Sequence, residues 1–498
     1  MRESSTSEKI GAAVKNNVSQ GLALVYGVGM LTWTAFNQMN SNYWSYFLTD
    51  ICGLEASVMG TVKSISAVGA WIFIIVAAIV IEKIWLRHGQ IRSWLAIAPV
   101  CAFVCLGLTW IDPPLPVAAK AIWMIVFYML GQFCVNFFMI SATSLVPTIS
   151  HTEHDRTLLS QRKAQGNMIV KVLFAALSLP IILSLNSLFY GVSYGDAKAA
   201  GPAGFSVLAV ILGIIMVVMF YYLYKKVAGM DPTEEYCEAR YQAKKAGKPI
   251  PKPENKNEEK VSLAEMLKGW ITNIPALSSL FAEITRFVAQ MVIYGMAMYY
   301  FLYVYDDTTM VAIMLTAVNI AGLVGTFASE PLAQKAGVRP VYMLGIIIAF
   351  FGMLFGYLFG AMDKWVFVGC MCVVFFGMNF MNGTMIGVQS NAIAYGQWRD
   401  GKAPKAFIMS TYQWCPQIAN AVAGALMGFG LSAIGFTKGM EATPALAQGM
   451  INIMCLVPAV VFAVGFIVFF FGYRLNSEKM AKIAQDLQDR EAEEAKQQ

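Results

Sequence analysis

Residues 82–92 read EKIWLRHGQIR, and residues 330–339 read EPLAQKAGVR. In both segments a glutamate precedes a basic residue by five positions and a glycine by seven, and an arginine follows the glycine. Each segment begins where a long apolar run ends, so a short basic turn joins two apolar helices at both places. The charges of such a turn are expected to meet anionic lipid or a neighbouring helix end. The recurrence indicates that a helical unit has been duplicated.

The composition places most of the chain in lipid. Its 498 residues are 57% hydrophobic and 13% charged, whereas soluble proteins are about 25% charged. A helix needs about 20 apolar residues to cross a bilayer. Twelve segments meet that need: 20–48, 57–82, 93–111, 116–147, 164–186, 203–224, 273–304, 309–331, 339–361, 364–395, 404–434 and 446–473. The sequence therefore predicts an all-α membrane protein with twelve transmembrane helices.

A polar stretch rich in lysine, glutamate and proline separates the first six segments from the last six. We expect a six-helix bundle over 1–224, a cytoplasmic linker over 225–272, a second bundle over 273–473 and a cytoplasmic tail over 474–498. Of the 36 lysines and arginines, 29 lie on one side of this arrangement, 4 on the other and 3 inside the membrane. By the positive-inside rule both termini are cytoplasmic.

The same charge pattern accounts for the net charge of +6 without a nucleic-acid partner. The nine cysteines form no CxxC pair. His151 and His154, with acids beside them, are typical of a charged turn rather than a metal site. The chain has no phosphate-binding Walker loop and no hydrolase or HExxH motif. We therefore expect no catalytic residue, no metal and no cofactor, and partners limited to a small solute and the lipid bilayer.

Five stretches, in order along the chain, resemble the glycoside-pentoside-hexuronide:cation symporters of the major facilitator superfamily. They are YFLTDICGL at 46–54, GQIRSW at 89–94, SLVPTIS at 144–150, YYFLYV at 299–304 and YGQWR at 395–399. The resemblance implies the major facilitator fold in the cell membrane, with two six-helix bundles around a solute site near the bilayer midplane. We expect the carrier to be a monomer.

The resemblance fails at the family's cation site. Its two helix 2 aspartates fall on Ala70 and Ile74, its helix 4 aspartate falls on Met139, and its threonine falls on Asn136. Coupling to sodium or protons needs carboxylate oxygens or an acid that changes protonation. We therefore expect this site to be lost, which predicts uniport or exchange.

The resemblance also marks positions that would contact solute. The family's helix 1 aspartate falls on Thr34 and its helix 11 lysine on Gln417, while Arg162 matches a cavity-lining arginine. Gln413 and Trp414 lie beside Gln417 and could hydrogen-bond and stack on a ligand. Lipid-facing aromatic packing is the alternative for Trp414.

Four charged residues lie well inside the apolar segments, away from their ends, where a charge costs about 2.5 to 3.5 kcal/mol on insertion scales. Glu283 and Arg286 are three residues apart on one helix face, so they form either a buried pair that fastens the helix or a substrate or gating contact. Lys63 could replace an arginine that the family has one turn later, or could extend to the membrane surface. Lys171 could likewise extend to the membrane surface or face the cavity.

These features predict a secondary transporter of a small polar solute: a sugar, a sugar acid or an organic anion. Cationic residues outnumber the single intramembrane acid, Glu283, and this favours an anion over a neutral disaccharide. A proton-coupled glycoside symporter using Glu283 is the first alternative. A membrane sensor or membrane enzyme is the alternative from another class.

Overall fold

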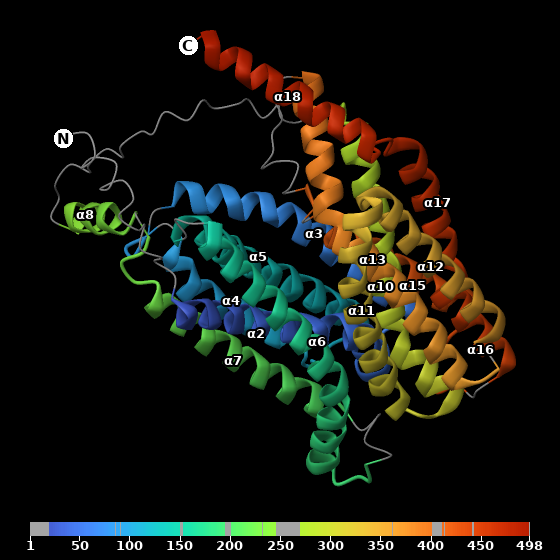
Figure 1. The fold of residues 1–498 in the computed structure, drawn as a ribbon. Coiled ribbons are helices and arrows are strands. Elements are labelled where there is room, and N and C mark those ends of the chain that lie inside the picture. The colour runs from blue at the N-terminus through green and yellow to red at the C-terminus, as the bar shows by residue number, and fades with distance from the viewer. Residues whose placement is uncertain are drawn as a thin grey trace.

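The computed structural model describes residues 19–84, 86–89, 91–149, 153–194, 201–231, 233–245, 269–360, 362–400, 411–412, 414–440 and 443–497. Every regular element in these ranges is a helix (Figure 1). The N-terminal half contains α2(Gln20–Tyr46), its π-helical extension η1(Phe47–Ile51), α3(Ala56–Lys83), α4(Arg92–Leu108), α5(Val117–Ile149), α6(Glu153–Tyr190) and α7(Ala203–Lys226). The C-terminal half contains α10(Ile274–Tyr305), α11(Thr309–Ala336), α12(Val338–Phe359), α13(Lys364–Asp400), α15(Trp414–Ala433), α16(Pro444–Ile451), η3(Asn452–Leu456) and α17(Val457–Gly472). The helices α8(Glu234–Lys245) and α18(Ser477–Gln497) follow the two halves.

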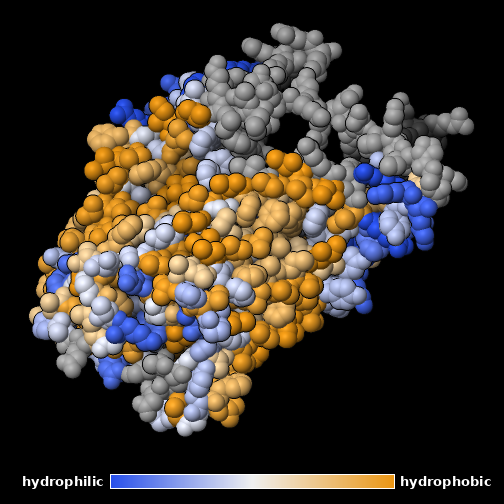
Figure 2. Space-filling view, turned by 180° about the vertical axis from the view of Figure 1, so that it is seen from behind, coloured by the Kyte–Doolittle hydropathy of each residue, from blue (hydrophilic) through white to orange (hydrophobic). Residues whose placement is uncertain are grey.

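Nine helical segments of the described chain are long and apolar enough to cross a membrane. The other three expected spans coincide with α2, α4 and α15. Helix α4 has only 17 residues, and α2 carries buried polar side chains that lower its mean hydropathy. The lipid-facing character of the fold is visible in Figure 2, where apolar side chains cover most of the face shown. Exposed residues such as Leu188 and Ile122 belong to this apolar surface.

The duplicated basic turn has the same backbone conformation in both halves. Gly89 has φ +99° and Gly337 has φ +90°, values that other residues rarely adopt. Each glycine follows a long helix, α3 or α11, and precedes the next one. The turn therefore needs glycine at the same register in each half, as an internal repeat requires.

The charges of the first turn meet a helix of the linker. Arg87 pairs with Glu238 of α8 at 2.9 Å, and Arg92 pairs with Glu234 at 3.0 Å. The Asp231 carboxylate accepts hydrogen bonds from the backbone N–H groups of residues 91 and 92. The bond from Arg87 holds the pKa of Glu238 below its usual value. The start of the linker is therefore attached to the N-terminal half, which the linker's polar composition alone did not indicate.

The two halves meet at the end opposite α8, called here the closed end. Helices α3 and α15 touch there through glycine: a Cβ on Gly60 would lie 2.7 Å from the Gly428 Cα and 2.9 Å from the Gly424 carbonyl oxygen. Beside this contact, Thr49 and Tyr299 share a hydrogen bond of 2.7 Å between α2's extension and α10. From this contact the two groups of helices diverge toward the ends where α8 and α18 lie (Figure 1).

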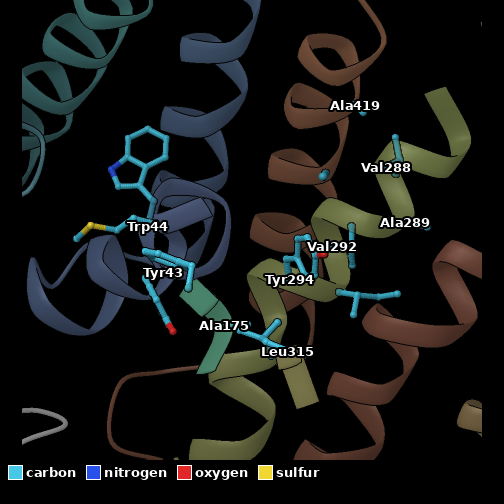
Figure 3. Packing of buried hydrophobic residues seen from close by; sticks show 14 of the residues in the cluster. Tyr43, Trp44, Ala175, Val288, Ala289, Val292, Tyr294, Leu315 and Ala419 are labelled. Carbon is cyan, nitrogen blue, oxygen red and sulfur yellow. The ribbon is translucent and has the colours of Figure 1, made fainter. Parts of the chain in front are cut away.

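Buried apolar side chains fill the space between the halves next to this contact (Figure 3). The labelled residues come from α2, α6, α10, α11 and α15: Tyr43, Trp44, Ala175, Val288, Ala289, Val292, Tyr294, Leu315 and Ala419. Helices from both halves therefore share one core, and it holds α10 against α2.

Gly60→Ala is expected to destabilise the protein by about 1 to 3 kcal/mol, because the new methyl group would push α3 away from the backbone of α15. Gly107→Ala is the matched control, since a Cβ there has no heavy atom within 4 Å and alanine stabilises a helix relative to glycine. Thermal unfolding in detergent should show a lowered midpoint temperature for Gly60→Ala only. Equal midpoints for the two variants would show that α3 and α15 can move apart without loss of stability.

Candidate functional site

A cavity of about 330 Å³, called here cavity 1, lies between the two halves. Its walls come from α2, α3, α5 and α6 of the N-terminal half and from α10 and α15 of the C-terminal half. Its polar and aromatic lining residues are Trp33, Asn37, Asn40, Ser41, Trp44, Lys63, Tyr128, Gln132, Asn136, Thr143, Lys163, Gln417 and Asn420. Acidic residues are absent from the lining within the described part of the chain. A cavity of this size suits a monosaccharide-sized solute.

Carboxamides form the largest polar group in cavity 1. They occur in pairs three or four residues apart, so that each pair shares a helix face: 37 and 40 on α2, 132 and 136 on α5, 417 and 420 on α15. Asn40 is 5% exposed, and neither its Oδ1 nor its Nδ2 has a hydrogen-bond partner among the described residues. A buried carboxamide without partners is costly, so a ligand hydroxyl that both donates and accepts would stabilise it.

Two lysines place positive charge in the same cavity. Lys63 lies two turns into α3, near the closed end, and donates to the Ser45 Oγ at 2.7 Å. Lys163 is partly buried near the start of α6, toward the α8 side. Neither has an ion-pair partner in the described part of the chain. Partial burial lowers the pKa of the Lys163 amine. The cavity therefore has uncompensated cations toward both of its ends.

An aromatic surface completes the wall. Trp44 and Tyr128 are stacked with ring centroids 4.3 Å apart and planes 13° from parallel. Both border cavity 1 although their side chains are almost fully buried. Rigid aromatic faces of this kind can contact the apolar C–H face of a sugar ring.

The positions that match the family's cation site form an apolar part of the same region. Ile74 and Met139 line cavity 1, and Ala70 is buried at 1% exposure. Asn136 donates to the Ala70 carbonyl oxygen at 3.4 Å. Carboxylate oxygens, which a sodium ion would require, are therefore missing from the cavity wall here.

The remaining predicted solute contacts are divided between the cavity and other parts of the structure. Gln417 lines cavity 1. Thr34 instead donates to the Asn167 Oδ1 at 2.6 Å, and Arg162 donates to the Gln20 Oε1 at 3.1 Å near the start of α2. Trp414 packs edge to face against Trp71 and Trp270. Gln413 lies outside the described residues. The structure thus brings Lys63, Asn136 and Gln417 together, but not Thr34, Arg162 or Trp414.

Asn37, Asn40, Gln132, Asn420 and Lys163 were not predicted as solute contacts. The helical spacing of the carboxamides was a usable signal, because three apolar segments each carry an amide pair on one face. The direction in which each face points could not be obtained from spacing, since that depends on how the helices pack.

Glu283 and Arg286 form a buried ion pair within α10. Their side chains are 0% and 5% exposed. Tyr412 and Tyr342 donate to the Glu283 carboxylate at 3.1 and 3.3 Å. The Phe287 ring lies 4.2 Å from the Arg286 guanidinium carbon. The carboxylate is therefore held by three residues from α10, α12 and the segment before α15, and Glu283 is not among the residues that line cavity 1.

The model of the MFS/sugar transport protein family matches residues 25–477. The chain belongs to this family. It is a multi-pass protein of the cell membrane and a transporter, not an enzyme. The isoprimeverose transporter of Lactiplantibacillus pentosus is 23% identical over 462 residues, with 91% of this chain and 88% of the relative covered. A glucuronide carrier protein homolog of Escherichia coli strain K12 is 20% identical, with 90% of each chain covered.

Solved structures show the same fold for this transporter. The crystal structure of a D-xylose-proton symporter superposes with a TM-score of 0.65 at 14% sequence identity, covering 92% of this chain and 98% of the other. This likeness confirms the major facilitator fold expected from the resemblance. At this identity the likeness concerns the fold alone.

Glu283→Gln and Arg286→Gln should each destabilise the transporter by about 3 to 5 kcal/mol, because each leaves a buried charge without its partner. The double variant should be destabilised by much less than the sum of these two values. Thermal unfolding of the four proteins in detergent measures this coupling. A second double-mutant cycle on the exposed pair Arg87–Glu238 provides the control. Solvent screening should leave little coupling energy between these two residues. Additive losses at 283 and 286 would contradict the pairing.

Proposed function

We propose that this protein carries a sugar acid, or a closely related hydroxylated organic anion, across the cytoplasmic membrane by uniport or exchange. In this proposal all twelve helical segments span the membrane, and both termini and α8 are cytoplasmic. The α3–α15 contact then closes the outer side, and cavity 1 faces the cytoplasm.

The observation that carries the proposal is the lining of cavity 1: carboxamides, stacked aromatic rings and two lysines, without a described acid. Carboxamides donate to and accept from hydroxyl groups. Lys63 and Lys163 provide charge-assisted hydrogen bonds to a carboxylate or sulfonate. A neutral sugar would satisfy the amides but leave both cations uncompensated. The relatives include an isoprimeverose transporter and a glucuronide carrier protein homolog, and the lysines favour an acidic solute of the second kind here.

Transport would proceed by alternating access. Solute enters cavity 1 while the closed end holds α3 against α15. The solute then interacts with α2 and α5 of one half and α15 of the other, which draws the halves together on the α8 side. Opening of the glycine contact at the closed end would release it outside. The reverse sequence gives uptake, so the solute gradients set the direction.

The alternative of proton coupling through Glu283 has less support from the geometry. Its carboxylate is already occupied by Arg286 and by two tyrosine hydroxyls. Protonation would remove the partner of a buried arginine, which is unfavourable. In the proposal, Glu283 therefore fixes Arg286 and does not carry a proton.

A sugar acid should bind at least tenfold more tightly than its amide or alcohol analogue, corresponding to about 1.4 kcal/mol. The expected reason is the charge of Lys63, so Lys63→Gln should remove most of this preference and leave the analogue's affinity almost unchanged. Glucuronate and glucuronamide, tested by thermal shift and by counterflow in proteoliposomes, are suitable first probes.

Lys335→Gln is the control, because it removes an exposed cation at the end of α11, a helix that does not line cavity 1. Affinity for the acid should also fall as the pH is raised through the lowered pKa of Lys163, where that amine loses its charge. Equal binding of acid and analogue by the unmodified protein would reject the anion proposal and favour a neutral glycoside.

Counterflow should be unchanged when sodium is replaced by choline, because Ala70, Ile74 and Met139 supply no carboxylate. Net uptake into vesicles that are not pre-loaded with solute should be unchanged by a proton ionophore as well, if Glu283 is structural. A fall of more than about tenfold in the counterflow rate on removing sodium would be inconsistent with uniport or exchange. Such a fall corresponds to about 1.4 kcal/mol of coupling between sodium and solute. Loss with the ionophore alone would instead support the proton-coupled alternative.

A further inference from the structure

A second cavity, cavity 2, has a volume of about 160 Å³ and lies on another side of α10. It is bordered by α6 of the N-terminal half and by α10, α11 and α13 of the C-terminal half. Its polar lining residues are Lys171, Arg286, Gln290, Tyr294, Asn319, Asn379 and Asn382. As in cavity 1, the described lining has no acidic residue. It differs in being about half as large and in lacking a tryptophan wall.

The charge of cavity 2 comes mainly from Lys171. In the described part of the chain its amine has neither a hydrogen-bond partner nor an ion-pair partner. Arg286 lies across the cavity on α10, but Glu283 compensates its charge. The cavity therefore has about one net positive charge, and a cation at this depth is unfavourable without a partner.

Arg286 has donors left after it has bound Glu283. Its Nε and one terminal nitrogen are directed at that carboxylate. The other terminal nitrogen reaches only the Gln290 Oε1, at 3.5 Å. Gln290 is 3.4 Å from the Tyr294 hydroxyl, which donates to Asn319 at 3.1 Å. These bonds hold the guanidinium in place, with its weakly used N–H groups available to an oxyanion.

We propose that cavity 2 binds a free, compact oxyanion of the sulfate, phosphate or small carboxylate class, separately from the solute in cavity 1. Lys171 supplies the compensating charge and Arg286 supplies oriented N–H donors. The volume suits such an anion but not a sugar acid together with its ring. Lys171 belongs to the N-terminal half and Arg286 to the C-terminal half, so the anion links the two halves and stabilises their approach on that side of α10.

The test is equilibrium binding of radiolabelled inorganic sulfate to the full-length protein in nanodiscs, in chloride-free buffer. Lys171→Gln should weaken sulfate binding at least tenfold, and Lys171→Arg should restore most of it. The matched control is Lys163→Gln, which removes a cation from the same helix but from cavity 1, and it should change sulfate affinity less than twofold. Cooperative thermal unfolding in the absence of sulfate, with a midpoint close to that of the unmodified protein, would verify that each variant is folded.

Three results would overturn the proposal. Sulfate binding that is equal in the unmodified protein and in Lys171→Gln would exclude cavity 2. Binding that depends on Lys163 rather than Lys171 would assign the anion to cavity 1. If Lys171→Gln weakens glucuronate binding but not sulfate binding, cavity 2 holds the acid group of the transported solute instead of a free anion. Competition between sulfate and glucuronate in the unmodified protein, with only sulfate dependent on Lys171, would support two linked sites.

Discussion

The halves of this transporter are held together where α3 and α15 carry glycine at their closest approach. A side chain on Gly60 or Gly428 would meet backbone atoms rather than a side chain that could move. This end is consequently packed tightly, with apolar residues and the Thr49–Tyr299 bond beside it. The other ends can diverge because they lack such a contact among the described residues (Figure 1). Both cavities are bordered by helices of both halves.

The polar lining of cavity 1 also explains which spans the sequence identifies most easily. A helix facing lipid must be apolar nearly all round, whereas a helix facing a cavity can carry amides on one side. Helices α2 and α15 each place two carboxamides in cavity 1, and α2 has further buried polar residues. Their lower hydropathy is therefore a consequence of their position. The length of an apolar segment predicted the helices, and the polarity of α2 and α15 contained information about the site.

The sequence identified helices that carry polar residues of the site, but it did not show which face of each helix points into the cavity. Lys63, Asn136 and Gln417 lie in cavity 1, while Thr34 and Trp414 are turned toward other helices. Spacing fixes which residues share a face, but the rotation of that face depends on packing against all neighbours. The attachment of α8 to Arg87 and Arg92 was missed for a related reason. Its carboxylates lie about 150 positions away in a segment whose composition is typical of a solvated linker.

The intramembrane charges separate into two kinds, and this distinction limits what each can do. Arg286 is compensated by Glu283 and held by Gln290, so its charge is permanently available but contributes little net attraction. Lys63 and Lys171 inside the apolar segments, and Lys163 just before one of them, have no described acidic partner, and each lines a cavity. A chain that only needed stability would be better served by apolar residues at these positions. Uncompensated lysines are retained at a cost that an anion can offset, and their division between two cavities is the reason to expect two anionic groups rather than one.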